Sequence, residues 1–160
     1  MAKTTATITL ASKDIADNSF NISNTAALSI AGAVTGITET TGLSRKKIAS
    51  GTEVDLITIA HNPDITAQKA AKVFIHNTST AADKYALIGV GEATGTPIYI
   101  GRLYGGDFMF FPWLALPTDG DGQAASEADG GTVGHAGNMD ITIKMNDATE
   151  TVIEYMVFHE

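Results

Sequence analysis

The chain lacks cysteine and is poor in positive charge: its 160 residues include no cysteine, and lysine and arginine together number 10. The absence of cysteine excludes disulfides, thiol nucleophiles and cysteine-based zinc sites. The formal net charge of −8 at pH 7 opposes non-specific binding to nucleic acid and to anionic lipid, because both select basic surfaces. We therefore expect no direct nucleic-acid binding and no membrane partner.

Long apolar runs are also missing. No stretch approaches the roughly 18 apolar residues of a membrane-spanning helix. The opening residues, MAKTTATITL, do not contain the continuous apolar segment of a secretion signal, so we expect synthesis in the cytoplasm. The composition, 44% hydrophobic and 18% charged, is that of a folded domain that can bury a core.

Helical periodicity is scarce, whereas strand-like alternation recurs along the chain. Only residues 62–72 fit a short helix. Alternation with a period of two is clear at Thr7–Leu10, 54–56, 73–76, 141–145 and 152–158. About eight to ten strands without alternating helices predict an all-β fold, specifically an antiparallel β-sandwich of jelly-roll type.

Bulky apolar residues are scarce near the N-terminus, which predicts that the chain divides into an N-terminal arm and a core domain. Residues 1–50 predict an extended N-terminal arm with the first strands, which packs on partners or neighbouring copies. Residues 51–160 predict the β-sandwich domain. Within it, residues 118–137, TDGDGQAASEADGGTVGHAG, predict a long loop between two strands.

The sequence contains no complete catalytic, metal-binding or nucleotide-binding motif, so no catalytic residue, cofactor or metal is predicted. The four histidines lack metal-ligand spacing. Asp119–Gly122 begins like a calcium loop, but Gln123 and Gly130 stand where ligands are needed. In Gly89–Gly95, Thr94 stands where a dinucleotide loop needs its third glycine, and Pro97 follows, which favours a hairpin turn.

The only basic cluster is Ser44–Lys47, which contains Arg45, Lys46 and Lys47. A solvated loop is one interpretation of this cluster. The other is an anchor for an acidic patch on a partner protein, because complementary charge steers association. Three positive charges are too few to bind a nucleic-acid duplex.

Residues 100–113, IGRLYGGDFMFFPW, place five aromatic residues within ten positions. Tyr104–Asp107 predicts a turn between two strands, because glycine supplies the positive φ that tight hairpins require. Pro112 is expected to end the second strand, because proline has no N–H to donate. Trp113 then closes an end of the sandwich or reaches an interface.

The strand after this turn is apolar on both faces. Phe108 and Phe110 share one face, and Met109 and Phe111 share the other. One face should meet the domain core, and the other a second sheet or a neighbouring subunit. The candidate interface residues are therefore Arg45, Lys46, Lys47, Tyr104, Phe108, Phe110 and Trp113.

The order of three segments, KVFIHNTSTAADKYALIGVG, IGRLYGGDFMFFPW and DITIKMNDATETVIEYMVFHE, resembles that of small all-β structural proteins of tailed bacteriophage particles. The resemblance covers about residues 71–158 and contains no catalytic signature. It is carried by Asn77–Thr78, Ile88–Gly89, Gly101–Leu103, Gly106–Phe108, Phe111–Trp113, Asp140–Lys144 and Ile153–Phe158.

What this resemblance implies is a virion component without chemistry of its own. Capsid decoration is the favoured role, in which a cement protein binds and stabilises a shell of major capsid protein. Its location is then the capsid surface of the virion, after synthesis in the host cytoplasm. A homotrimer is expected, because exposed strand edges and apolar faces can be hidden around a three-fold axis.

Three alternatives remain open from the sequence. The first is a neck, tail or head-fibre component of the same kind of particle. The second is a carbohydrate-binding host-adhesion module that stacks sugars on Tyr99, Tyr104 and Trp113. The third is a glycan hydrolase with paired carboxylates, for which the candidates are Asp119, Asp121, Glu127 and Asp129.

Overall fold

A computed structural model describes residues 4–13, 20–28, 37, 39–58, 71–91, 93–113, 140–146 and 150–159. The long loop expected at 118–137, with the carboxylates of the hydrolase alternative, lies outside the described residues. So does most of the helix expected at 62–72. The last two residues of that range are described, and they begin a strand.

Every described element of regular structure is a strand, and every pair of neighbouring strands is antiparallel. This confirms the prediction of an all-β antiparallel fold. Eleven strands lie within the described ranges, slightly more than expected. They are β1 (Thr5–Ser12), β2 (Phe20–Ala27), β3 (Glu39–Thr40), β4 (Ser44–Ile48), β5 (Glu53–Ile57), β6 (Ala71–Asn77), β7 (Tyr85–Val90), β8 (Ile98–Tyr104), β9 (Phe108–Trp113), β10 (Ile141–Met145) and β11 (Thr151–His159).

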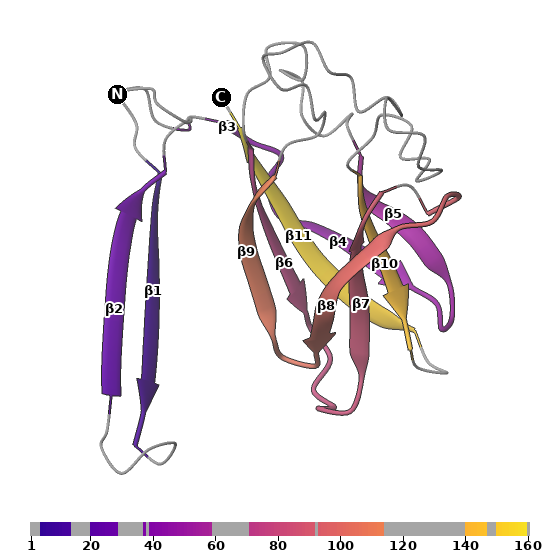
Figure 1. Cartoon of the computed structure of the whole chain (residues 1–160), viewed down its shortest axis with the longest axis horizontal. Helices are drawn as coiled ribbons and strands as arrows, with labels where there is room; N and C mark the ends of the chain where they lie inside the picture. Colours follow the sequence, from indigo (N-terminus) through magenta and orange to yellow (C-terminus); the bar gives the residue numbers. More distant parts are fainter. Residues whose placement is uncertain are drawn as a thin grey trace, which may run out of the picture.

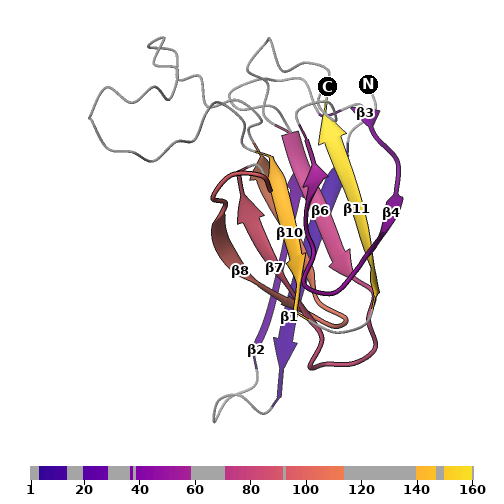
Figure 2. The same ribbon diagram turned by 90° about the vertical axis from the view of Figure 1, so that its right-hand side faces the viewer.

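Apart from β1 and β2, the strands form two sheets. In sheet I the order is β11–β6–β9, and both β3 and β4 pair with the free side of β11. In sheet II the order is β5–β10–β7–β8. Figure 2 shows β10, β7 and β8 of sheet II on one side and β6, β11 and β4 of sheet I on the other.

The two sheets share one hydrophobic core, because the period of two turns every second side chain inward. In β6, Ala71, Val73, Ile75 and Asn77 are buried, and the residues between them are half-buried. The buried core cluster also contains residues of the other sheet strands, namely Ile48, Leu56, Ile57, Ala86, Ile88, Leu103, Trp113, Ile141, Ile143, Met145, Ile153 and Val157.

Among the described strands, β1 and β2 pair only with each other, and they stand apart from the two sheets (Figure 1). The Leu28 N–H donates to the carbonyl of Thr4, and the Ile37 N–H donates to the carbonyl of Leu28. These bonds tie the base of the hairpin together. The side chains farther along it are exposed on both faces.

The segment between β8 and β9 carries the chain from sheet II to sheet I, and it confirms the predicted turn. The Asp107 N–H donates to the carbonyl of Tyr104, and Gly106 has a φ of 86°. The predicted end of the strand at Pro112 is wrong by one residue, since β9 continues to Trp113. Because β9 is an edge strand, it tolerates a residue without an N–H.

The solvated-loop interpretation of Ser44–Lys47 is also wrong. These residues form most of β4 and pair with β11 from Thr151 to Tyr155. The alternation is that of a half-covered strand: Arg45 and Lys47 are exposed, Lys46 is half-buried, and Ile48 is in the core. The Lys46 Nζ donates to the carbonyl of Asp55 at 2.9 Å, which joins β4 to sheet II.

Candidate interaction surface

The outer face of sheet I carries a continuous apolar surface. The register aligns Phe110, Phe74 and Met156 in one row across β9, β6 and β11. We define the aromatic patch as Phe74, Phe108, Phe110, Met156 and Phe158. The rings of Phe74 and Phe108 lie 6.1 Å apart, as do those of Phe110 and Phe158. Phe108 is 61% exposed and the other four members are half-buried, so the described residues cover this face only in part.

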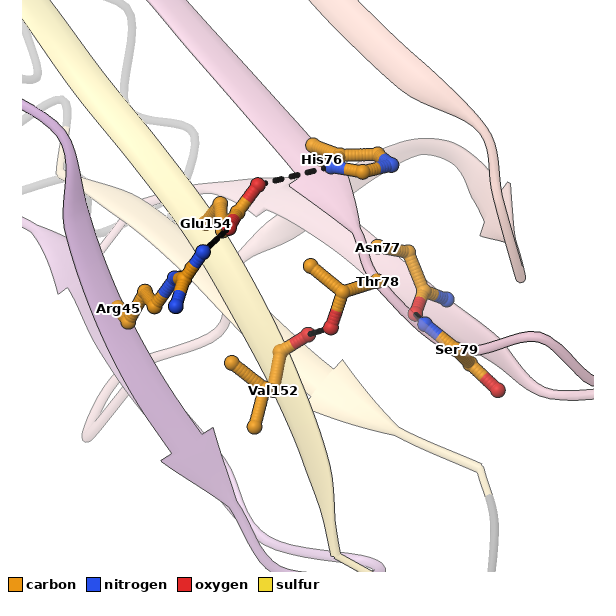
Figure 3. Close-up of polar contacts among 7 residues, drawn as sticks. All are labelled: Arg45, His76, Asn77, Thr78, Ser79, Val152 and Glu154. Carbon is orange, nitrogen blue, oxygen red and sulfur yellow. Dashed lines mark hydrogen bonds and ion pairs between the residues drawn. The ribbon is translucent and has the colours of Figure 1, made fainter.

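One end of the aromatic patch is bordered by a row of charged side chains. The register places Phe108, His76, Glu154 and Arg45 side by side across four strands. The Arg45 Nε donates to Glu154 Oε1 at 2.8 Å, and His76 Nδ1 lies 3.0 Å from Glu154 Oε2 (Figure 3). The carboxylate of Glu154 is thus held between a guanidinium and an imidazole.

These contacts change the ionisation of Glu154. The hydrogen bond with His76, followed by that with Arg45, lowers the pKa of Glu154 below its ordinary value. Beside this group lies an open pocket of about 330 Å³, lined by Arg45, Thr78, Val152 and Glu154. The two charges on its wall neutralise each other, so the pocket offers no unpaired charge to a ligand.

We expect Glu154→Gln to destabilise the fold at neutral pH and progressively less in acid. Because the folded-state pKa is lowered, the stabilisation is present above the unfolded-state value of about 4.3 and is lost as the pH falls through the folded value. Urea unfolding of both proteins from about pH 7 to about pH 3 measures the difference. Glu150→Gln is the matched control, because Glu150 pairs with Lys47 in an exposed ion pair that contributes little. If the difference in unfolding free energy between the two proteins stayed constant over this pH range, it would contradict the pairing of Glu154 with His76 and Arg45.

The outer face of sheet II carries a second, more polar cluster. Tyr85 and Tyr104 face each other across β7 and β8, with ring centroids 5.5 Å apart. The guanidinium of Arg102 lies 4.7 Å from the ring centroid of Tyr85. Tyr99 lies above Gly89, where a Cβ would approach the tyrosine ring to 3.2 Å. Tyrosine and arginine are the residue types that dominate binding energy at protein interfaces.

Tyr99 also contacts β5 through its hydroxyl. Partial burial, and then the hydrogen bond and the charge of Glu53, raise the pKa of Tyr99 to about 12. The neutral phenol is therefore the stabilised form. Its contribution to stability is present below the unfolded-state pKa of about 10 and is lost as the pH rises through the folded value.

We expect the phenol of Tyr99 to titrate at about pH 12. Subtracting the near-ultraviolet absorbance titration of Tyr99→Phe from that of the native chain isolates this group. Glu53→Gln should lower the midpoint but leave it above the ordinary value of 10.0, because partial burial remains. An isolated midpoint at the ordinary value in the folded native chain would contradict the contact.

The β1–β2 hairpin offers a third apolar surface. The register places Ile8 and Leu10 of β1 on the same side as Ile22 of β2, and these three side chains form what we call the hairpin face. They are 46%, 55% and 57% exposed, respectively. The opposite side is polar: the hydroxyls of Thr7 and Thr25 are 2.8 Å apart, and those of Thr9 and Ser23 are 3.2 Å apart.

The structure separates the predicted interface residues into three groups. Phe108 and Phe110 lie on the outer face of sheet I, and Arg45 and Lys47 lie on the same face at the opposite edge of the sheet. Tyr104 lies on the outer face of sheet II. Trp113 is in the core at 3% exposure, and Lys46 is held by Asp55.

The sequence prediction missed three of the five members of the aromatic patch, since Phe74, Met156 and Phe158 were not among its candidates. The signal was present, because alternation in β6 and β11 turns all three away from the buried positions. What it did not show is that β9, β6 and β11 are neighbours. Only that pairing gathers the apolar side chains into one surface.

Other kinds of site find no support within the described ranges. The described residues hold no group of three histidine, aspartate or glutamate side chains placed to bind a metal ion. Among the same residues, no helix is long and apolar enough to cross a membrane.

The chain matches no family model, no curated protein and no solved structure with which it was compared.

Proposed function

We propose that this protein is a non-enzymatic structural component of a tailed bacteriophage virion, a capsid decoration protein that binds and stabilises the shell of major capsid protein. The observation that carries the proposal is that the chain presents two separate contact surfaces, the aromatic patch on sheet I and the tyrosine and arginine cluster on sheet II, as a protein would need that joins its own copies and also binds a shell. Monomeric proteins seldom expose contiguous apolar surface without a partner to cover it. The motif resemblance over residues 71–158 supplies the kind of particle.

We further propose that the two sheets form a jelly-roll sandwich with residues 1–50 as an arm and first strands. The strand order supports this. Numbered from β4 to β11, one sheet reads β4–β11–β6–β9 and the other β5–β10–β7–β8. This order, in which β4 pairs with β11 and β5 pairs with β10, is the one that two Greek keys produce, an arrangement found in viral capsid and lectin domains.

The contact with the shell is assigned to the outer face of sheet II. Tyr85, Tyr99, Arg102 and Tyr104 lie there together, and their residue types suit the centre of a protein interface. Arg45 and Lys47 are each paired with a glutamate of their own chain. They are therefore assigned a secondary role at the rim.

Stabilisation would follow from mass action. A protein that binds only the expanded shell lowers the free energy of that state, and many copies add their contributions. A homotrimer would bind the shell more tightly than a monomer. Once one of its three subunits is attached, the other two are held near the shell at a high effective concentration.

The test uses shells assembled from the major capsid protein that the same genome encodes. The purified chain should co-sediment with expanded shells and raise their unfolding temperature. Removal of residues 1–30 should leave a folded chain that attaches more weakly. A chain that stays unbound with expanded shells would refute the role. Binding to bacterial surface glycans that Tyr99→Ala and Tyr104→Ala abolish would support the host-adhesion alternative.

A further inference from the structure

Two apolar surfaces of the same chain are left fully or partly exposed by the described residues. One is the hairpin face, formed by Ile8, Leu10 and Ile22. The other is the aromatic patch on the outer face of sheet I, where Phe108 is the most exposed member. The hairpin of a chain does not cover the patch of that chain, since both surfaces are exposed at once.

The hairpin requires a partner for physical reasons. An isolated two-stranded hairpin is marginally stable in water, because one sheet face contributes too little burial to offset the ordering of the chain. Here the polar side is satisfied by paired hydroxyls between the strands. No layer of described residues packs on the hairpin face in the same way, since Ile8, Leu10 and Ile22 are exposed. We infer that the hairpin face of one copy packs on the aromatic patch of a second copy.

Charge favours a second copy over a charged partner. The strand segments Thr5–Ser12 and Phe20–Ala27 contain no charged residue. A strongly charged partner would find no complementary group on them. Each copy has a net charge of −8, but the five members of the aromatic patch are uncharged. Direct charge repulsion between the two contacting surfaces is therefore absent. Burial of apolar area then drives the association.

The spacing of the two surfaces is compatible. Ile8 and Leu10 are two residues apart on β1, as Phe108 and Phe110 are on β9. At a rise of about 3.4 Å per residue, both pairs repeat at about 7 Å. Side chains of the hairpin face can therefore seat between the rings of the patch in a regular layer.

The contact joins different surfaces, so each copy gives one hairpin and receives another. Such head-to-tail contacts close into a ring when the rotation between copies is a simple fraction of a turn. A three-membered ring satisfies this condition. The inference thus deepens the proposed function by naming the surfaces that join its copies, and it rests on the self-assembly in that proposal rather than on the shell.

Charge variants test the two surfaces. Leu10→Asp and Phe108→Asp should each weaken self-association, measured by sedimentation velocity, by at least about tenfold in dissociation constant, which is about 1.4 kcal/mol. Thr9→Asp is the matched control, because Thr9 lies on the opposite side of the same strand and an aspartate there still accepts from Ser23. Its self-association should not change. Circular dichroism checks that each variant is folded.

Mixing distinguishes this contact from a general loss of structure. Leu10→Asp retains an intact patch, and Phe108→Asp retains an intact hairpin face. An equimolar mixture should form a dimer that neither variant forms alone. If the mixture remains monomeric while the native chain assembles, the inference is wrong.

Cross-linking gives a direct readout, because the native chain has no cysteine. Asn24 lies opposite Ile8 on the side of the hairpin face, and Pro112 borders the patch on β9. Asn24→Cys mixed with Pro112→Cys and a short bismaleimide should give a heterodimer on a denaturing gel. Thr25→Cys, on the polar side, replaces Asn24→Cys in the control mixture and should give none.

Each other outcome overturns the inference. In a chain that carries both substitutions, cross-linking without an increase in mass would show that the hairpin covers its own patch. No cross-link at concentrations where the native chain assembles would place the contact elsewhere. A native chain that is strictly monomeric in solution would also overturn the inference. All these measurements omit the shell, so they can fail while shell binding succeeds, and the reverse.

Discussion

Replacing Asn77 by aspartate should lower the free energy of unfolding by about 3–5 kcal/mol, the cost of an uncompensated charge in a protein interior. Asn77 is 0% exposed. Its Nδ2 donates to the carbonyls of Leu103 at 3.0 Å and Lys84 at 3.2 Å. A carboxylate would direct negative charge at both carbonyl oxygens, and neither carbonyl would keep its donor.

The effect is large because Asn77 joins three segments at one corner. Its Oδ1 accepts from the Ser79 N–H (Figure 3), its main-chain N–H donates to Asp107, and its carbonyl accepts from Gly106. The end of β6 is thereby bonded to the turn that leads into β9. Since β9 carries Phe108, damage here should also disorder the aromatic patch.

Urea unfolding followed by circular dichroism measures the change. Asn146→Asp is the matched control: Asn146 is exposed and accepts from the Tyr85 N–H through Oδ1, which a carboxylate can replace. We expect its stability to change by no more than about 0.5 kcal/mol. The loss in Asn77→Asp should shrink as the pH falls, because burial raises the pKa of a carboxyl and acid returns it to the neutral form. A loss no greater than that of the control would show that the corner is not held by this amide.

The second large effect is expected from Gly105→Ala. A Cβ at Gly105 would overlap the main-chain oxygen of Ala81 and lie 3.0 Å from that of Ser79. Both obstacles are backbone, so a side-chain rotation cannot relieve them. The corner must open, at a cost of about 3 kcal/mol, the upper part of the usual range for overpacking.

Gly106→Ala is the matched control for this substitution. Gly106 has a φ of 86°, and nothing lies within 4 Å of where its Cβ would be. Only left-handed backbone strain of about 1–2 kcal/mol is expected. If positive φ alone set the cost, Gly106→Ala would be more destabilising than Gly105→Ala. The urea midpoints of the two variants therefore show whether backbone strain or steric overlap has the larger effect. If Gly106→Ala is the more damaging, close approach of the backbone at Gly105 is not what holds the corner.

The elements that could be predicted from sequence are those whose signal is local. Alternation located the strands at 73–76, 141–145 and 152–158, and the glycines at 105–106 located the turn. The same local rules failed at Ser44–Lys47, where polar composition favoured a loop. There, pairing with β11 outweighs local preference, as tertiary context commonly does in sheets.

The candidate surface was half predictable for the same reason. The two apolar faces of residues 108–111 predicted a layer on each side of this strand. Which side faces the core, and which strands flank β9, depends on residues far away in the chain. Asn77 gave no sign that it would be a buried hydrogen-bonding centre, because its partners come from β8 and from the segment before β7.

The sequence by itself determined that this chain is all-β, acidic and free of cysteine chemistry, because composition and a period of two depend only on residues close together in the chain. Tertiary structure alone decided that Trp113 is buried, that Glu154 lies between Arg45 and His76, and that five apolar side chains gather into one patch on the outer face of sheet I. The physical reason is pairing. A strand fixes which of its side chains share a face, but the order of strands in a sheet fixes which faces become neighbours.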